Sequence, residues 1–182
     1  LILIDGDVFE EHNLNRQLLS SEAGLGASKA RAARQRVGRI NSAVEVIEHP
    51  VTLTRENLPR LLEGAQVVAD ALDRLPTRLI LQEGAQAQGI PMVHGSIAGF
   101  LGQVMTIFPG DPGLRGLYGE PSQLPEQGLE TRLGTPAATP MAVAAWESQE
   151  VVKILLGQGE LLRNRLLLLD MEAGTVEVLQ LG

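Results

Sequence analysis

Short apolar runs alternate with helix-patterned segments along the first half of this chain, and this alternation constrains the fold more than any other feature. The expected strands are residues 1–4, 44–47, 67–72 and 91–94, and the expected helices are residues 29–40, 57–63 and 76–88. Ser28 is the expected N-cap of the first helix, and Gly89 the expected stop of the last. Strands that alternate with helices predict a parallel sheet, because each parallel connection needs a crossover.

The last third of the chain adds strands without helices between them. We expect a strand at residues 104–108, a long surface loop at 109–136, a helix at 139–156 that ends at Gly157, and a hairpin of strands 166–170 and 175–181. The predicted fold class is α/β: a Rossmann-like, mostly parallel sheet with helices on both faces, extended by antiparallel C-terminal strands. We expect residues 1–182 to form a single domain.

The composition excludes several classes of function. The net charge of −7 argues against a large nucleic-acid-binding face, which needs clustered positive charge. The chain has no cysteine, so disulfides, thiolate metal sites and cysteine nucleophiles are excluded. No apolar run reaches the roughly 18 residues that a membrane span needs, so we expect a cytoplasmic protein without membrane contact.

Four segments, in order along the chain, resemble motifs of one enzyme family. Residues 5–17 (DGDVFEEHNLNRQ) resemble the pattern D-x-D-x-V-x-x-x-N-L-x-R-Q, and residues 26–30 (GASKA) resemble G-x-x-K-A/V. Residues 70–78 (DALDRLPTR) are similar to D-x-x-D-N-x-x-x-R, and residues 150–157 (EVVKILLG) to E-x-x-K-x-L-x-G. The family is the ThiF/MoeB/HesA group of adenylate-forming enzymes, prokaryotic relatives of ubiquitin-activating enzymes.

The resemblance implies an ATP-dependent adenylyltransferase. Its expected substrate is the C-terminal glycine of a ubiquitin-like sulfur-carrier protein, and its products are an acyl adenylate and pyrophosphate. The implied context is sulfur transfer for thiamine, molybdopterin or related biosynthesis. The resemblance also implies Mg²⁺ as a cofactor and a homodimer as the assembly.

The resemblance assigns ATP-binding roles to Asp5, Asn13, Arg16, Lys29 and Asp73. Asp5 ends a strand, where its carboxylate can accept hydrogen bonds from ribose hydroxyls. Arg16 can grip phosphate with two donors, and Lys29 adds a charge at a helix N-terminus. Asp73 is expected to hold Mg²⁺ on the triphosphate, so Arg16 and Asp73 are the expected catalytic residues.

Each of these residues has a simpler interpretation when it is taken alone. Asp5 can merely start a loop, and Asp73 can cap the helix that follows it. Arg16 and Lys29 can be solvated surface charges. The histidines are too scattered for a metal site and are interpreted as structural or exposed: His12, His49 and His94.

The chain also departs from the family pattern. The glycine-rich nucleotide loop that precedes the Asp5 strand in the family is absent, so we expect an N-terminal extension or a second chain to supply it. Gly113 and Gly116 stand where many members have a zinc-binding cysteine pair, so we predict no zinc. Arg74 replaces the usual asparagine beside Asp73, where it can pair with that carboxylate or clash with the nucleotide.

Other functions stay open from the sequence alone. A non-catalytic pseudo-enzyme or scaffold of the same fold would show no ATP-dependent thermal shift. An enzyme that adenylates a non-protein carboxylate or a tRNA base would gain from a basic face, which this acidic chain with two lysines does not offer. A nicotinamide-dependent oxidoreductase shares the acidic residue after a strand, but it does not account for the other motif residues.

Overall fold

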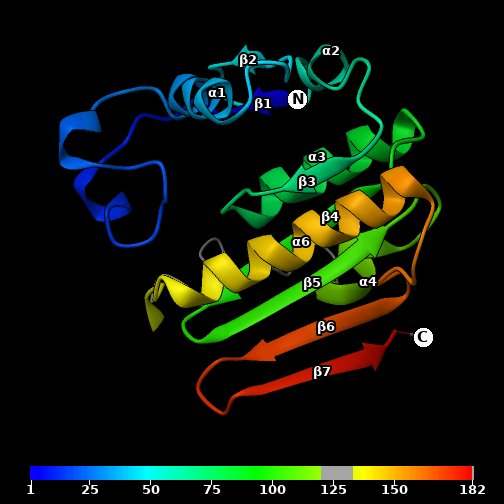
Figure 1. The fold of residues 1–182 in the computed structure, drawn as a ribbon. Coiled ribbons are helices and arrows are strands. Elements are labelled where there is room, and N and C mark those ends of the chain that lie inside the picture. Colours follow the sequence, from blue (N-terminus) through cyan, green and yellow to red (C-terminus); the bar gives the residue numbers. More distant parts are fainter. Residues whose placement is uncertain (120–132, 182) are drawn as a thin grey trace. The chain divides into compact units, whose positions relative to one another are not determined.

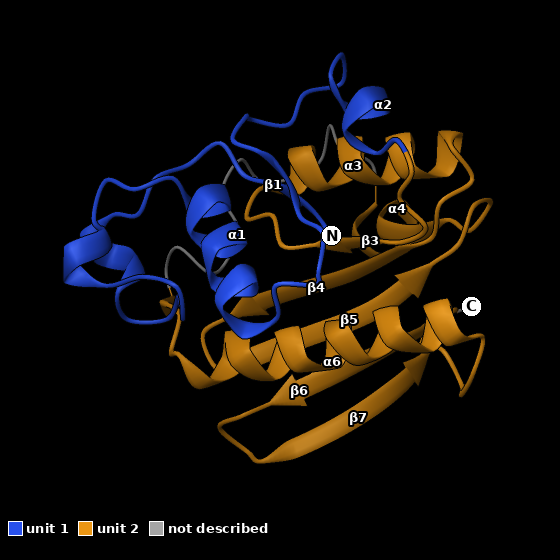
Figure 2. Cartoon of the chain, turned by 45° about the horizontal axis from the view of Figure 1, so that its top comes forward, with its two compact units in different colours: residues 1–63 blue, residues 64–182 orange. Residues whose placement is uncertain are grey.

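The structure, a computed structural model, describes residues 1–119 and 133–181 (Figure 1). The chain divides into two compact units, residues 1–63 and residues 64–182, which are coloured separately in Figure 2. Each unit has its own sheet and its own helices. Within the described residues, no helix is both long enough and apolar enough to cross a membrane.

The first unit is built on a parallel pair of strands, β1 and β2. Its elements in chain order are β1 (Ile2–Ile4), two 3-10 turns (Glu11–Asn13 and Glu22–Gly24), α1 (Lys29–Ile40), β2 (Ile47–His49) and α2 (Leu58–Leu61). The helix α1 packs against both strands. It is the crossover that lets β1 and β2 run parallel, as the alternation in the sequence predicts.

The strand β2 begins later than predicted, at Ile47 rather than at Val44. Asn41 is the C-cap of α1, and a turn follows it directly. In that turn the Val44 amide donates to the Asn41 carbonyl at 3.2 Å, and the Ala43 amide donates to the Asn41 side chain at 3.0 Å. Because Val44 is used in the turn, pairing with β1 starts only after it.

The second unit contains a five-stranded sheet in the order β3-β4-β5-β6-β7 (Figure 1). The strands are β3 (Val68–Asp70), β4 (Met92–Ala98), β5 (Leu101–Ile107), β6 (Arg165–Asp170) and β7 (Thr175–Gln180). The pair β3–β4 is parallel, whereas β4–β5, β5–β6 and β6–β7 are antiparallel. The predicted fold class is confirmed: parallel strands early in the chain, helices, and an antiparallel C-terminal extension that includes the predicted hairpin.

Helices cover both faces of this sheet (Figure 1). They are α3 (Leu75–Ala87), α4 (Gly113–Tyr118) and α6 (Ala138–Leu156). The side chains of β5 alternate between the two faces. Val104 belongs to the buried cluster that contains Val143 of α6, whereas its neighbour Gln103 donates a hydrogen bond to the Tyr118 hydroxyl of α4. Thus α6 covers one face, and α3 and α4 cover the other.

Two local signals set helix ends as predicted. Ser28 caps α1, because its side chain accepts a hydrogen bond from the Arg31 amide. Gly157 follows α6 with φ of 61°, a left-handed conformation that glycine adopts without the steric cost of a Cβ. The helix α6 therefore stops where the sequence places its last apolar turn.

Part of the predicted long loop is helical. The prediction treated residues 109–136 as loop, but α4 occupies Gly113–Tyr118, and residues 120–132 lie outside the described part. Leu114 is fully buried, and its amide donates to Gln82 Oε1 of α3 at 2.7 Å. Burial of this leucine and its hydrogen bond to α3 outweigh the low helix propensity of the glycines in α4.

We predict that Gly102→Ala destabilises the second unit, because an added Cβ would lie 2.5 Å from Val143 Cγ2. The expected cost is about 1–3 kcal/mol, measured by urea unfolding. Gly38→Ala in α1 is the matched control: nothing lies within 4 Å of its Cβ, and the change should stabilise by roughly 0.5–1 kcal/mol. Unchanged stability of the Gly102 variant would contradict the close packing of β5 on α6.

Candidate functional site

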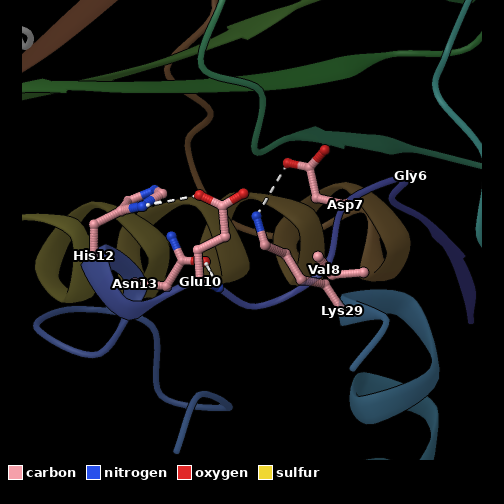
Figure 3. A pocket seen from close by; sticks show the side chains of 7 residues that line it. All are labelled: Gly6, Asp7, Val8, Glu10, His12, Asn13 and Lys29. Atoms are coloured by element: carbon pink, nitrogen blue, oxygen red, sulfur yellow. Dashed lines mark hydrogen bonds and ion pairs between the residues drawn. The ribbon is translucent and has the colours of Figure 1, made fainter. Parts of the chain in front are cut away.

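An open hollow of about 320 Å³ lies beside the end of β1, within the first unit (Figure 3). Open parallel sheets bind ligands at the carboxyl ends of their strands, and the hollow is at that end of β1. Its lining residues are Gly6, Asp7, Val8, Glu10, His12, Asn13 and Lys29. A second hollow contains none of the predicted site residues; it is lined by Arg31, Arg34, Gln35 and Glu48.

Backbone hydrogen bonds bring the start of α1 to the hollow beside β1. The Phe9 amide donates to the Ala27 carbonyl at 3.0 Å, and the Lys29 amide donates to the Asp7 carbonyl at 3.0 Å. Phe9 is buried and anchors this loop. At the end of β1, the Asp5 carboxylate turns the chain by accepting a hydrogen bond from the Asp7 amide at 2.8 Å. The N-terminus of α1, with its partial positive charge, therefore lies at the edge of the hollow.

Lys29 supplies a full positive charge to the hollow. Its Nζ lies 3.1 Å from Asp7 Oδ2, and Figure 3 shows the two side chains directed toward each other. The Lys29 side chain is 17% exposed, whereas that of Asp7 is 74% exposed. A pair with one exposed member contributes little net stability, so its ammonium can exchange the carboxylate for another anion. The hollow is therefore suited to an anionic ligand.

Asn13 is the second predicted residue in this lining. Its side chain is buried, and its Oδ1 accepts a hydrogen bond from the Glu10 amide at 3.0 Å. That bond closes the short turn that carries Glu10 and His12, whose side chains pair at 3.2 Å. The structure thus brings Asn13 and Lys29 together at one hollow.

Arg16 and Asp5 are not among the residues that line the hollow. Arg16 is half-buried, and its Nη1 donates to the His12 carbonyl and to Asn15 Oδ1, each at 2.9 Å. Asp5 is half-buried and is used in the turn that ends β1. The predicted contacts of these two residues with phosphate and ribose stay predictions.

Asp73 lies in the second unit, in the exposed loop between β3 and α3. The N-cap of α3 is Arg74 rather than Asp73, and the Arg74 side chain makes no capping hydrogen bond. The interpretation of Asp73 as the cap of this helix therefore does not hold. Within the described part of the chain, Asp73 and Arg74 form no ion pair with each other.

A buried charge cluster that the sequence analysis did not identify lies at the end of β3. Asp70 is 1% exposed, and its Oδ2 lies 2.7 Å from His94 Nδ1 and 3.6 Å from Arg78 Nη1. Burial lowers the pKa of His94, which favours the neutral ring, and the neighbouring carboxylate then places the proton on Nδ1. Arg78 is therefore the cation that balances Asp70.

His94 connects this cluster to α4. With its proton on Nδ1, its Nε2 accepts a hydrogen bond from the Tyr118 hydroxyl at 3.4 Å. The Tyr118 hydroxyl also lies 3.3 Å from Ser96 Oγ and accepts from Gln103 Nε2. The chain of polar groups therefore runs from the end of β3 through β4 to α4.

The sequence contains a signal for this cluster. Asp70 and Arg78 belong to the same motif-like segment as Asp73, and His94 ends the next predicted strand. In the parallel pairing of β3 and β4, Asp70 stands opposite His94. Recognising the cluster required the register of the two strands, which the sequence pattern does not specify.

Glu147 of α6 packs on the backbone of β4. An added Cβ on Gly95 would lie 2.4 Å from Glu147 Cδ, so a side chain at position 95 would displace this carboxyl group. Its Oε1 is buried and has no hydrogen-bond partner among the described residues. Burial, and then the negative charge of Asp70, raise the pKa of Glu147 to about 8, against the opposing effect of Arg78. Glu147 is therefore mostly protonated at neutral pH.

Comparison with known proteins identifies relatives over nearly the whole chain. The profile described as ThiF family matches residues 1–182. A Haloferax volcanii protein named SAMP-activating enzyme E1 is 35% identical over 173 residues, which cover 93% of this chain and 63% of that protein. A Thermus thermophilus protein named sulfur carrier protein adenylyltransferase is 34% identical over 176 residues, which cover 92% of this chain and 64% of that protein. The chain thus spans a little under two thirds of the length of these relatives.

Solved structures share the fold. The crystal structure of Escherichia coli MccB with ATP matches 100% of this chain and 56% of that chain, with a TM-score of 0.81 and 20% identity. The crystal structure of PaaA matches 100% of this chain and 56% of that chain, with a TM-score of 0.76 and 20% identity. At this identity the likeness shows the fold alone, and it agrees with the mixed α/β architecture.

We predict that Glu147→Gln changes how stability depends on pH. The pKa of Glu147 is raised in the folded state, so its contribution to stability is fully present below the ordinary value of 4.5 and is lost as pH rises through about 8. Glutamine does not titrate. The free energy of unfolding of the variant, relative to that of the wild type, should therefore rise by roughly 2–4 kcal/mol between about pH 5 and about pH 9. Urea unfolding at both pH values measures the difference.

Glu172→Gln is the control for this experiment. Glu172 is exposed in the turn between β6 and β7, so its replacement should leave the pH dependence of unfolding unchanged. Parallel pH profiles for the wild type and Glu147→Gln would contradict a carboxyl group that is neutral in the folded protein.

Proposed function

The chain belongs to the ThiF family, and from this membership we propose that it forms an ATP-dependent adenylyltransferase domain for a ubiquitin-like sulfur-carrier protein. The names of two relatives, a sulfur carrier protein adenylyltransferase and a SAMP-activating enzyme E1, support this substrate class. The observation that carries the proposal is the hollow where Lys29, Asn13 and the N-terminus of α1 meet. We include both compact units, residues 1–182, in one ThiF domain.

In the proposed reaction, a carboxylate oxygen of the carrier's C-terminal glycine attacks the α-phosphorus of ATP. The bond between this phosphorus and the oxygen that bridges to the β-phosphate breaks, and pyrophosphate leaves with the electron pair. The product is an acyl adenylate, an activated carbonyl for a later sulfur donor in thiamine, molybdopterin or related biosynthesis. These 182 residues contain no cysteine, so they carry no thioester or persulfide themselves.

The residues of the first unit bind and orient ATP in this proposal. Lys29 exchanges Asp7 for a phosphate oxygen, and the α1 N-terminus beside it favours the same negative charge. Arg16 adds a second cation on the phosphates, and Asp5 accepts hydrogen bonds from the ribose hydroxyls. Asn13 holds the turn that shapes the hollow. Fixed positive groups of this kind stabilise charge that develops as pyrophosphate leaves.

Asp73 is the proposed Mg²⁺ ligand. The described residues contain no group of three or more His, Cys, Asp or Glu side chains that would hold a metal by themselves. Mg²⁺ on a nucleotide needs no such group, because it keeps water and phosphate oxygens as ligands and one or two carboxylates suffice. The exposed Asp73 carboxylate fits that requirement, and Mg²⁺ bound there would neutralise triphosphate charge. A homodimer and a cytoplasmic location belong to the same proposal.

We predict that Lys29→Ala slows ATP–pyrophosphate exchange by about a hundredfold or more, because it removes a fixed cation from the developing charge. The assay uses the full-length protein with a carrier protein that ends in Gly-Gly, and follows labelled pyrophosphate into ATP. A carrier without the terminal Gly-Gly should support no exchange.

Arg36→Ala is the matched control, since Arg36 is an exposed cation on the same helix, away from the hollow. It should leave the exchange rate within about twofold of the wild type. Equal rates for Lys29→Ala and the wild type would contradict the proposed site. A wild-type protein with neither exchange nor a thermal shift on addition of ATP would instead support the non-catalytic scaffold.

A further inference from the structure

Leu72, the residue before Asp73, is held by both of its backbone polar groups. Its amide donates to Asp70 Oδ1 at 3.0 Å, and its carbonyl oxygen accepts from Arg78 Nη2. Arg78 is itself fixed, because its Nη1 donates to the Gly95 carbonyl at 2.6 Å and lies 3.6 Å from Asp70 Oδ2. The loop between β3 and α3 is thus tied to the buried cluster at the peptide unit that leads into Asp73.

We propose that Arg78 is a positioning residue for Asp73, which sets the affinity of that carboxylate for Mg²⁺ by holding the Leu72 carbonyl oxygen. This inference rests on the proposed function, in which Asp73 binds Mg²⁺. The Leu72 carbonyl and the Asp73 amide belong to one planar peptide unit, so a grip on the oxygen orients the backbone from which the Asp73 side chain projects. Among the described residues, the Asp73 side chain has no hydrogen bond that would do this instead.

An arginine is needed for this grip. The guanidinium is planar and presents its donors as a rigid fork, so Arg78 reaches Leu72 with one nitrogen and Gly95 with the other. A lysine ammonium keeps the charge but cannot span both carbonyl oxygens in this fixed geometry. Asp70 completes the arrangement, because its carboxylate balances the buried cation and its other oxygen holds the Leu72 amide.

A merely structural role for Arg78 predicts a different phenotype. Loss of packing would lower the unfolding temperature and the amount of active protein without changing the Mg²⁺ requirement. Loss of positioning would change the affinity for Mg²⁺, because removal of a group that orients a metal ligand typically changes metal affinity or activity by about 10- to 100-fold. The Mg²⁺ dependence of the reaction therefore separates the two roles.

The test is the Mg²⁺ dependence of ATP–pyrophosphate exchange by the full-length protein that carries Arg78→Lys. We expect the Mg²⁺ concentration for half-maximal exchange to rise by about tenfold or more, with the KM for ATP at saturating Mg²⁺ unchanged. Asp73→Asn is the reference variant and should shift the Mg²⁺ requirement in the same direction. Arg163→Lys is the control, because it removes the fork that the more exposed Arg163 presents to Asp111, away from Asp73 in the sequence, and should leave the requirement unchanged.

A folded Arg78→Lys protein with the wild-type Mg²⁺ requirement would overturn the positioning role and leave the proposed function intact. A wild-type protein without exchange would overturn the proposed function and this inference with it. If Arg78→Lys does not fold, hydrogen exchange of the native wild-type protein tests whether the loop is held in the arrangement that includes Arg78. The Leu72 amide, which donates to Asp70 Oδ1, should exchange as slowly as the amides of β3, and exchange at the rate of an open loop would overturn that arrangement.

Discussion

The buried Asp70 carboxylate depends on two partners, the Arg78 guanidinium, which balances its charge, and the His94 ring, which donates a hydrogen bond to it. At 1% exposure a carboxylate without such partners would lose its hydration with nothing to replace it. Its partners come from α3 and β4, and its second oxygen holds the Leu72 amide. One buried charge therefore ties the end of β3, the first turn of α3 and the facing strand β4 together. The crossover from β3 through α3 to β4 depends on this cluster.

The two ion pairs at or next to predicted site residues differ in how far they are exposed to water. The Lys29–Asp7 pair has a partner that is 74% exposed, so water can solvate Asp7 when Lys29 binds another anion. The Arg78–Asp70 pair is buried, so removal of either member leaves an unpaired charge, which is costly. The first pair can open for a ligand, whereas the second fixes the backbone.

Local signals allowed much of the fold to be predicted from the sequence. The Ser28 cap and the Gly157 stop depend on residues within a few positions of each helix end, so the pattern alone places them. The start of β2 was predicted too early because Val44 belongs to the turn that follows Asn41. The alternation of apolar residues does not show that a turn competes with the strand at this position. The helix α4 depends on the hydrogen bond from the Leu114 amide to Gln82 of α3. These two residues are too far apart in the sequence for a local pattern to connect them.

The candidate site shows the same division between local and distant information. Asn13 and Lys29 follow from the motifs, and the pairing of the β1 loop with the start of α1 brings them to one hollow. Asp70 and Arg78 are both part of the quoted motif at residues 70–78, but Asp70 also lies inside the apolar run at residues 67–72, so its buried ion pair was not predicted. The pairing becomes apparent only when the β3–β4 register places His94 opposite Asp70. Motif residues can thus be found from the sequence, whereas their mutual contacts depend on burial and register, which only the structure supplies.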